Sequence, residues 1–286
     1  MIYLVASIVC FSLMMVIFKY LEKYQVNTFM AITINYIVAN ILGVYISGNI
    51  LGLDELVAQP WALNAAIIGT TFIVLFYLIA LTAQKMGVTV STIANKMSVV
   101  IPVIFAIILY NDSVTVLKVS GIILALIGVY LSSKKEEKIE IDKKYVYLPL
   151  ILFVGSGLLD SLVNYTEKTM LDDANTPYFI PTLFLVAGSI GSLVCFYNIF
   201  RKKWKVKWNI FLWGIPLGIL NYGSIYYILK ALKADNLESS VIFPLNNVGI
   251  VLMSTFLSII LFSEKLSKIN KLGIGLSIVA IILISY

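Results

Sequence analysis

The sequence contains no histidine and only 2 cysteines among its 286 residues. Without histidine, most metal centres and most schemes of general acid–base catalysis lose their usual side chain. Cys10 and Cys195 lie inside apolar stretches and form no CxxC pattern, which is typical of small buried side chains. The sequence also has no P-loop and no dinucleotide-binding fingerprint. We therefore expect a protein that is not an enzyme, binds no metal or cofactor, and is not driven by nucleotide hydrolysis.

Charged residues are scarce as well, at 13% of the chain, whereas hydrophobic residues make up 60%. Soluble domains carry roughly 25% charged residues. The mean hydropathy is +0.96, and apolar runs long enough to cross a hydrocarbon core of ~30 Å recur along the whole chain. The sequence therefore predicts an all-α integral membrane protein. Its net charge of +6 lies mainly in short loops, which indicates membrane orientation and not nucleic-acid binding.

The apolar runs predict ten transmembrane helices in two sets of five. The runs cover residues 2–20, 28–47, 61–84, 89–110 and 115–133, and then 146–166, 178–200, 208–231, 237–262 and 268–286. The first run begins at Met1 without a basic segment or a cleavage pattern, so we expect it to be retained. A linker of alternating Lys and Glu, residues 134–144, separates a first five-helix repeat (1–133) from a second one (145–286).

Two long segments of the chain are similar to each other. Residues 106–133 and 258–285 align without gaps and share Ile-Ile-Leu, then an acid (Asp112 or Glu264), then a glycine (Gly121 or Gly273), then an apolar run. Self-similarity over such a length indicates a duplicated structural unit. The two halves are therefore predicted to be copies of one five-helix unit.

The charges of equivalent loops are opposite in sign. The first loop of one half is basic and that of the other acidic, and the second loops show the reverse, as seen in Lys19 and Lys23 against Glu167, Asp172 and Asp173, and in Asp54 and Glu55 against Arg201, Lys202, Lys203, Lys205 and Lys207. Because cytoplasmic loops are enriched in Lys and Arg, this exchange predicts two inverted five-helix repeats. With the basic loops in the cytoplasm, both termini lie outside a plasma (bacterial cytoplasmic) membrane.

This organisation resembles the drug/metabolite transporter superfamily, and in particular its EamA-type members. The resemblance covers nearly the whole chain and rests on Pro102, Asp112 and Gly121 in the first half and on Glu264 and Gly273 in the second. Two departures are Asp112 in place of the usual glutamate and Ser254 where a proline is common. The resemblance implies a secondary transporter, but the family handles amino acids, amines, nucleotide-linked sugars and drugs, and a fold alone does not choose among them.

Asp160 is the first candidate for a transport residue. It lies deep in the run 146–166 between leucines, and Asn164 follows four residues later on the same helical face. Ionisable side chains inside a membrane commonly mark transport pathways. The resemblance places Asp160 in the helix where small multidrug members of the superfamily keep a proton-binding carboxylate. We predict that Asp160 binds a proton or a cationic group; the alternative is a structural ion pair or hydrogen bond.

Lys96 is the basic counterpart of Asp160. It follows Asn95 within the run 89–110, where a lysine must find a partner, lose its proton or extend to the interface. We predict that Lys96 pairs with Asp160 across the two halves, and extension to the interface is the alternative.

Two groups of polar side chains complete the predicted binding site. Asn246 and Asn247 follow Pro244, almost at the repeat position of Asn95, and a proline can free a helix carbonyl for a ligand; hydrogen bonding between helices is the alternative.

Tyr222 and Tyr226 share one helical face with Lys230 and could hold a ring or a cation. An interfacial aromatic belt or packing is the alternative for them, and Tyr77 is their counterpart in the first half, with core packing favoured there.

These residues lead to one functional hypothesis. The protein is predicted to be an alternating-access transporter of a small polar or amphipathic metabolite, with an amino acid or amine favoured because one acid and one base complement a zwitterion. Its partners would be that metabolite and the lipid bilayer, with a coupled proton left open. The alternative is a lipid-handling protein or a non-transporting scaffold with the same fold.

Overall fold

The computed structural model describes residues 1–48, 51–86, 88–110, 114–133, 145, 147–233, 238–262 and 267–285. Within these ranges the chain is helical apart from short connections, with no strand. The predicted all-α class is confirmed. The predicted linker 134–144 lies outside the described residues, as do the turn residues Asp112 and Glu264.

The helices follow the predicted apolar runs. They are α1 (Ile2–Lys23), α2 (Thr28–Ser47), α3 (Leu53–Val57), α4 (Ala62–Met86), α5 (Val88–Met97), α6 (Val100–Tyr110), α7 (Val116–Ser133), α8 (Tyr147–Met170), α9 (Thr176–Phe200), α10 (Asn209–Lys233), α11 (Ser239–Phe262) and α12 (Lys268–Ser285). In the described residues, 6 helices are long and apolar enough to cross a membrane, namely α1, α2, α4, α8, α9 and α11. The chain is a multi-pass membrane protein, and ten spans stay a prediction.

The ends of α2 illustrate how the sequence sets helix boundaries. At its start, the Asn27 side chain accepts a hydrogen bond from the Met30 backbone N–H at 3.1 Å, which satisfies a helix-terminal donor. At its end, Gly48 has φ 74°, a left-handed conformation that glycine adopts without steric cost.

The predicted run 89–110 is not one helix. It is divided into α5 and α6 by a turn at Ser98 and Val99. Pro102 explains the break, because its ring has no N–H to donate to the Ser98 carbonyl and clashes with it. That carbonyl accepts from the Ile101 N–H at 2.9 Å instead. The expectation of a continuous fourth helix was wrong, and the fourth apolar run is a discontinuous helix.

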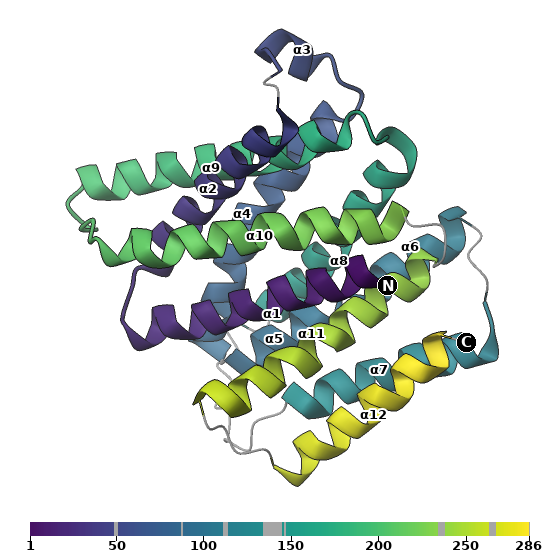
Figure 1. Ribbon diagram of the computed structural model, residues 1–286. Helices are drawn as coiled ribbons and strands as arrows, with labels where there is room; N and C mark the ends of the chain where they lie inside the picture. Colours follow the sequence, from purple (N-terminus) through teal and green to yellow (C-terminus); the bar gives the residue numbers. More distant parts are fainter. Residues whose placement is uncertain are drawn as a thin grey trace.

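Helices from opposite halves pack against each other as α2 with α9 and as α7 with α12 (Figure 1). In the first pair, Gly43 lies against Pro181 and Gly191 lies against Thr33. The start of one helix therefore meets the end of the other, so α2 and α9 are antiparallel. Tyr36 stacks on Phe184 between them, with ring centroids 6.0 Å apart.

The second pair is built in the same way. The Asn270 side chain donates to the Leu131 carbonyl at 3.0 Å, and Gly128 lies against Ser277 and Gly273. These contacts make α7 and α12 antiparallel, and small residues allow the two backbones to approach closely.

Three further contacts between the halves have counterparts. The pair α1–α10 has its counterpart in α8–α4, the pair α1–α11 in α8–α5, and the pair α2–α10 in α9–α4. Exchanging equivalent helices of the two halves reproduces these contacts. This pattern supports the predicted inverted repeat, which stays a prediction.

The close approach of α10 to α2 yields a test. A Cβ atom added at Gly218 would lie 2.6 Å from the backbone oxygen of Asn35 and 2.7 Å from Val38 Cβ. We expect Gly218→Ala to destabilise the purified protein by about 1–3 kcal/mol through overpacking, measured as a lower midpoint of thermal unfolding in detergent.

Gly275 provides the matched control, because a Cβ atom there would meet nothing within 4 Å. Gly275→Ala should leave the midpoint unchanged or raise it slightly, since alanine favours helix. Equal effects of the two changes would contradict the close packing of α10 on α2.

Candidate functional site

Helix α8 has one apolar face and one polar face. Ile151, Val154 and Leu158 are exposed on the apolar face. The other face carries a line of polar side chains at helical spacing, namely Ser156, Asp160, Asn164 and Glu167. Of these, only Asp160 is partly accessible, while the other three are buried. Asp160 therefore points away from the surface that would face lipid.

Lys96 lies at the discontinuous helix, in the last turn of α5. Its side chain is only 8% exposed, which argues against extension to the interface. The ammonium group donates to Asn247 Oδ1 at 3.4 Å and lies 4.4 Å from the centroid of the Phe11 ring. A helix C-terminus and an aromatic face both favour a cation.

Lys96 and Asp160 attract each other electrostatically, but they do not form an ion pair in the part of the chain that the structure describes. The direct pairing predicted from the sequence is thus replaced by a hydrogen bond to a neutral amide. Neither the Lys96 ammonium nor the Asp160 carboxylate is in direct contact with a group of opposite charge among the described residues.

The predicted asparagines connect the helices around Lys96. Asn95 donates to Ser156 Oγ on α8 at 3.0 Å, and Asn247 accepts from Lys96. Asn246 differs, because its Oδ1 atom is buried and lacks a hydrogen-bond partner among the described residues. An unpartnered buried acceptor is costly, so Asn246, next in sequence to Asn247, retains an unsatisfied acceptor.

Asn164 and Glu167 continue the polar face of α8 toward its C-terminal end. Asn164 Oδ1 accepts a hydrogen bond from Ser239 Oγ at 3.1 Å. Because Ser239 begins α11, this bond connects two helices. Glu167 was assigned to a loop from the sequence, and this is wrong: it lies within α8 and is only 4% exposed. Its Oε2 atom has no hydrogen-bond partner in the described chain. The spacing from Asp160 could have revealed it.

The predicted tyrosines form a separate group. Tyr222 is buried and stacks on Tyr226, with centroids 5.9 Å apart, and the Lys230 ammonium lies 5.4 Å from the Tyr226 ring centroid. The side chains of Tyr222, Tyr226 and Lys230 therefore pack on one another along α10. Tyr77 is 55% exposed on α4, so the core packing favoured for it is wrong.

An ion pair between the halves was missed by the sequence analysis; its lysine is buried, and its glutamate side chain is 39% exposed. Lys118, in the first turn of α7, is 6% exposed. Its ammonium group donates to the Glu238 carboxylate and, at 3.1 Å, to Ser240 Oγ at the start of α11. Lys118 falls within the predicted run 115–133, and no local pattern marked a partner for it. Its partners lie about half the chain away, so only the fold reveals the contact.

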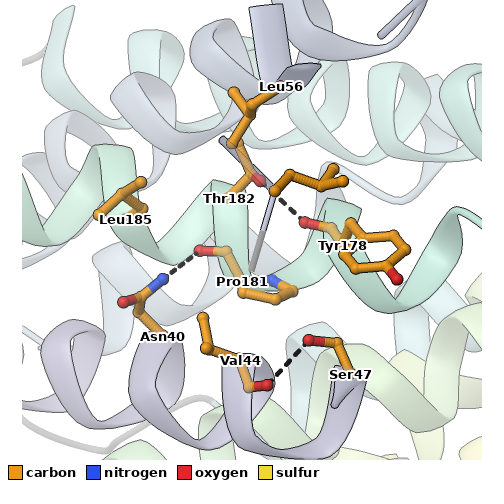
Figure 2. Close-up of a pocket in the computed structure, with 9 residues that line it drawn as sticks. Asn40, Val44, Ser47, Leu56, Tyr178, Pro181, Thr182 and Leu185 are labelled. Atoms are coloured by element: carbon orange, nitrogen blue, oxygen red, sulfur yellow. Dashed lines mark hydrogen bonds between the residues drawn. The ribbon is translucent and has the colours of Figure 1, made fainter. Parts of the chain in front are cut away.

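Two pockets among the described residues lie away from the predicted site residues. The smaller one, of about 80 Å³, lies between α2 and α9 with Leu56 of α3 over it (Figure 2). There Asn40 donates to the Pro181 carbonyl at 2.9 Å. The larger pocket lies at the α9–α10 loop and is basic.

The fold and these polar contacts define a multi-pass helical membrane protein with charged side chains at the junction of two halves. Residues 1–134 match the EamA-like transporter family. This match confirms, over the first 134 residues, the resemblance predicted from the sequence. The matching family is one of transporters and not of enzymes.

Two relatives extend over nearly the whole chain. An uncharacterized protein of Haemophilus influenzae (strain ATCC 51907 / DSM 11121 / KW20 / Rd) is 25% identical over 291 residues, covering 99% of this chain and 97% of the relative. A solved crystal structure of a protein has a TM-score of 0.77 at 13% identity and covers 99% of this chain and 94% of its own. At that identity the likeness shows the fold alone.

The two faces of α8 lead to a labelling prediction. In a variant with Cys10 and Cys195 replaced by alanine, we expect Asp160→Cys to react with a small water-soluble methanethiosulfonate at least ~10-fold faster than Leu158→Cys. A thiol reacts as the thiolate, which forms in water and not in lipid. Labelling is followed by mass spectrometry of the protein in liposomes.

Leu158 is the matched control because it lies two residues from Asp160 on the opposite face. Equal or inverted rates would show that the polar face of α8 borders no aqueous space.

Proposed function

We propose that this protein is a secondary transporter that moves a small polar or amphipathic metabolite across the plasma membrane by alternating access. The observation that carries the proposal is the meeting of Lys96 and the polar face of α8 at a discontinuous helix between the two halves. Transporters of this general kind bind substrates where broken helices meet at the interface of repeats. A charged side chain in that position needs a compensating partner.

The chemistry of the site favours an amino acid or an amine. Lys96 can bind a carboxylate, and Asp160 can bind an ammonium group or a proton. The free acceptor of Asn246 can take a further N–H or O–H. Phe11 provides an apolar wall beside Lys96. A zwitterion satisfies both charges at once, which a lipid chain cannot do.

The ion pair between Lys118 and Glu238 supports movement of the halves relative to each other. It joins α7 of the first half to α11 of the second half. With the basic loops in the cytoplasm, this pair lies at the outer end of the helices. We propose that the pair holds the outer end closed and separates when the site opens to the outside.

Glu167 gives the proposal a route for a coupled proton. It is buried and lies on the same face of α8 as Asp160, closer to the outer end. Lys233 and Lys168 attract it electrostatically. A proton entering from outside could bind Glu167 before reaching Asp160, with Asn164 between them.

Transport in proteoliposomes tests the function. With a panel of labelled amino acids, amines and sugars, we expect uptake of at least one zwitterion or amine, accelerated by a pH gradient. Asp160→Asn and Lys96→Met should each reduce the transport rate by more than ~10-fold. Removal of one charged group leaves the other buried and uncompensated.

Tyr77→Phe is the control, since Tyr77 is exposed on α4 and should tolerate the change. Folding of each variant is checked by its thermal midpoint. Full transport by both Asp160→Asn and Lys96→Met, or uptake of none of the metabolites by the unmodified protein, would reject the proposal.

Charge exchange tests the outer ion pair. Lys118 is buried, so a like charge placed opposite it, or an acid in its place, stays only partly solvated. Lys118→Glu and Glu238→Lys should therefore each lower both the thermal midpoint and the transport rate. The double exchange should recover a large part of both losses, because opposite charges again face each other.

The pair Lys233–Asp173 provides a comparison. The two charged groups lie 3.3 Å apart, and the Asp173 side chain is fully exposed. Such a pair contributes about 0–1 kcal/mol, so Asp173→Asn should have little effect. If the double exchange recovers nothing, the contact between Lys118 and Glu238 does not control the outer end.

A further inference from the structure

The larger of the two pockets lies where α9 and α10 leave the membrane. It has a volume of about 350 Å³, and it is formed by the connection between α1 and α2 together with the loop between α9 and α10. Its lining residues include Gln25, Asn27, Lys203, Trp204, Lys205 and Lys207. Three of these carry a positive charge, and no acidic side chain lines the pocket. The pocket is therefore suited to an anion.

The loop that presents the lysines has a defined conformation. Lys202 has φ 55°, and the backbone N–H groups of Lys203 and Trp204 both donate to the Asn198 carbonyl at 2.9 and 3.3 Å. The Trp204 ring packs on Phe29 of α2, with centroids 5.6 Å apart. These contacts fix the backbone from which Lys203, Lys205 and Lys207 extend.

Large apolar side chains are exposed in the helical turns on either side of the basic loop. Phe196 and Phe200 at the end of α9, and Trp208 and Leu212 at the start of α10, are all largely exposed. In a membrane protein such residues face lipid chains, and Trp is enriched at the level of the headgroups. A ligand that combines an anionic group with hydrocarbon chains would contact the lysines and these apolar side chains together.

Asn209 adds a second requirement. It lines the pocket, and its Oδ1 atom is buried without a hydrogen-bond partner in the described part of the chain. This acceptor needs a donor, which a phosphate diester does not have. A headgroup hydroxyl would supply one.

We propose that this pocket binds an anionic phospholipid whose headgroup carries hydroxyl groups, as in phosphatidylglycerol. Lys203, Lys205 and Lys207 contact the phosphate, Asn209 accepts from the glycerol hydroxyl, and the acyl chains lie along Phe196, Phe200 and Leu212. The site is separate from the transport site and does not depend on the proposed function. Basic pockets between transmembrane helices bind anionic lipid headgroups in the same way.

Lipid titration tests the proposal. The purified, delipidated full-length protein is titrated with phosphatidylglycerol, phosphatidic acid or phosphatidylcholine, and bound lipid is counted by native mass spectrometry. We expect phosphatidylglycerol to bind tightest and phosphatidylcholine weakest. Lys205→Gln with Lys207→Gln should weaken phosphatidylglycerol binding by about tenfold or more, since each basic residue near a lipid surface contributes on the order of 1 kcal/mol, reduced by salt.

Lys268→Gln with Lys271→Gln is the matched control, because it removes the same charge from exposed positions at the start of α12. It should leave binding unchanged. An equal loss in the control would show diffuse electrostatic attraction and overturn the pocket. Displacement of the lipid by millimolar inorganic phosphate would show an anion site without lipid specificity and would overturn it also.

Asn209→Ala separates the hydroxyl from the charge. It should weaken phosphatidylglycerol binding and leave phosphatidic acid binding unchanged. If both lipids respond equally, the hydroxyl contact is wrong. The lysine variants change exposed residues and Asn209→Ala a half-buried one, and an unchanged thermal midpoint confirms that each variant is folded.

Discussion

Every polar group in the hydrocarbon core of a membrane must find its partner inside the protein, and this constraint shapes the whole molecule. Helices satisfy it for the backbone, which explains why the described chain is helical apart from short connections. Among the described residues, the constraint is met with difficulty at the turn of Ser98 and Val99, along the polar face of α8, and at Asn246, whose Oδ1 atom is buried without a hydrogen-bond partner. The turn and the polar face of α8 both lie close to Lys96.

The position of Lys96 shows how the fold stabilises a buried cation only in part. The C-terminal end of α5, the Phe11 ring and the Asn247 amide each reduce the cost of burying the ammonium group. None of them carries a full negative charge, and Asp160 interacts from a distance beyond an ion pair. Pro102 creates the helix end at which Lys96 lies. One proline thus connects a break in the helix to an incompletely compensated charge.

The sequence predicted the helices, the membrane location and the polar positions of α8 because these depend on local composition and on helical spacing. It did not predict the break in the fourth apolar run, although the effect of Pro102 on the Ser98 carbonyl was available as a signal. Glu167 was assigned to a loop because a charge near the end of an apolar run resembles a loop charge, and Lys118 was left inside a run without a partner. Glu238 is 120 residues from Lys118 in the sequence, so no spacing rule could join them. Pairing across the halves requires the tertiary fold.

The contacts between the halves differ in strength according to where they lie. At the site around Lys96 they are hydrogen bonds to neutral side chains, and the one made by the ammonium group is as long as 3.4 Å. Between α7 and α11 the contact is an ion pair with a buried lysine, which is costly to leave without its partner. A ligand can replace the first kind of contact without a large loss, whereas the second kind must be compensated by new interactions elsewhere. This difference suits a protein in which ligand binding at the Lys96 site supplies the free energy for separating the helices that the ion pair joins.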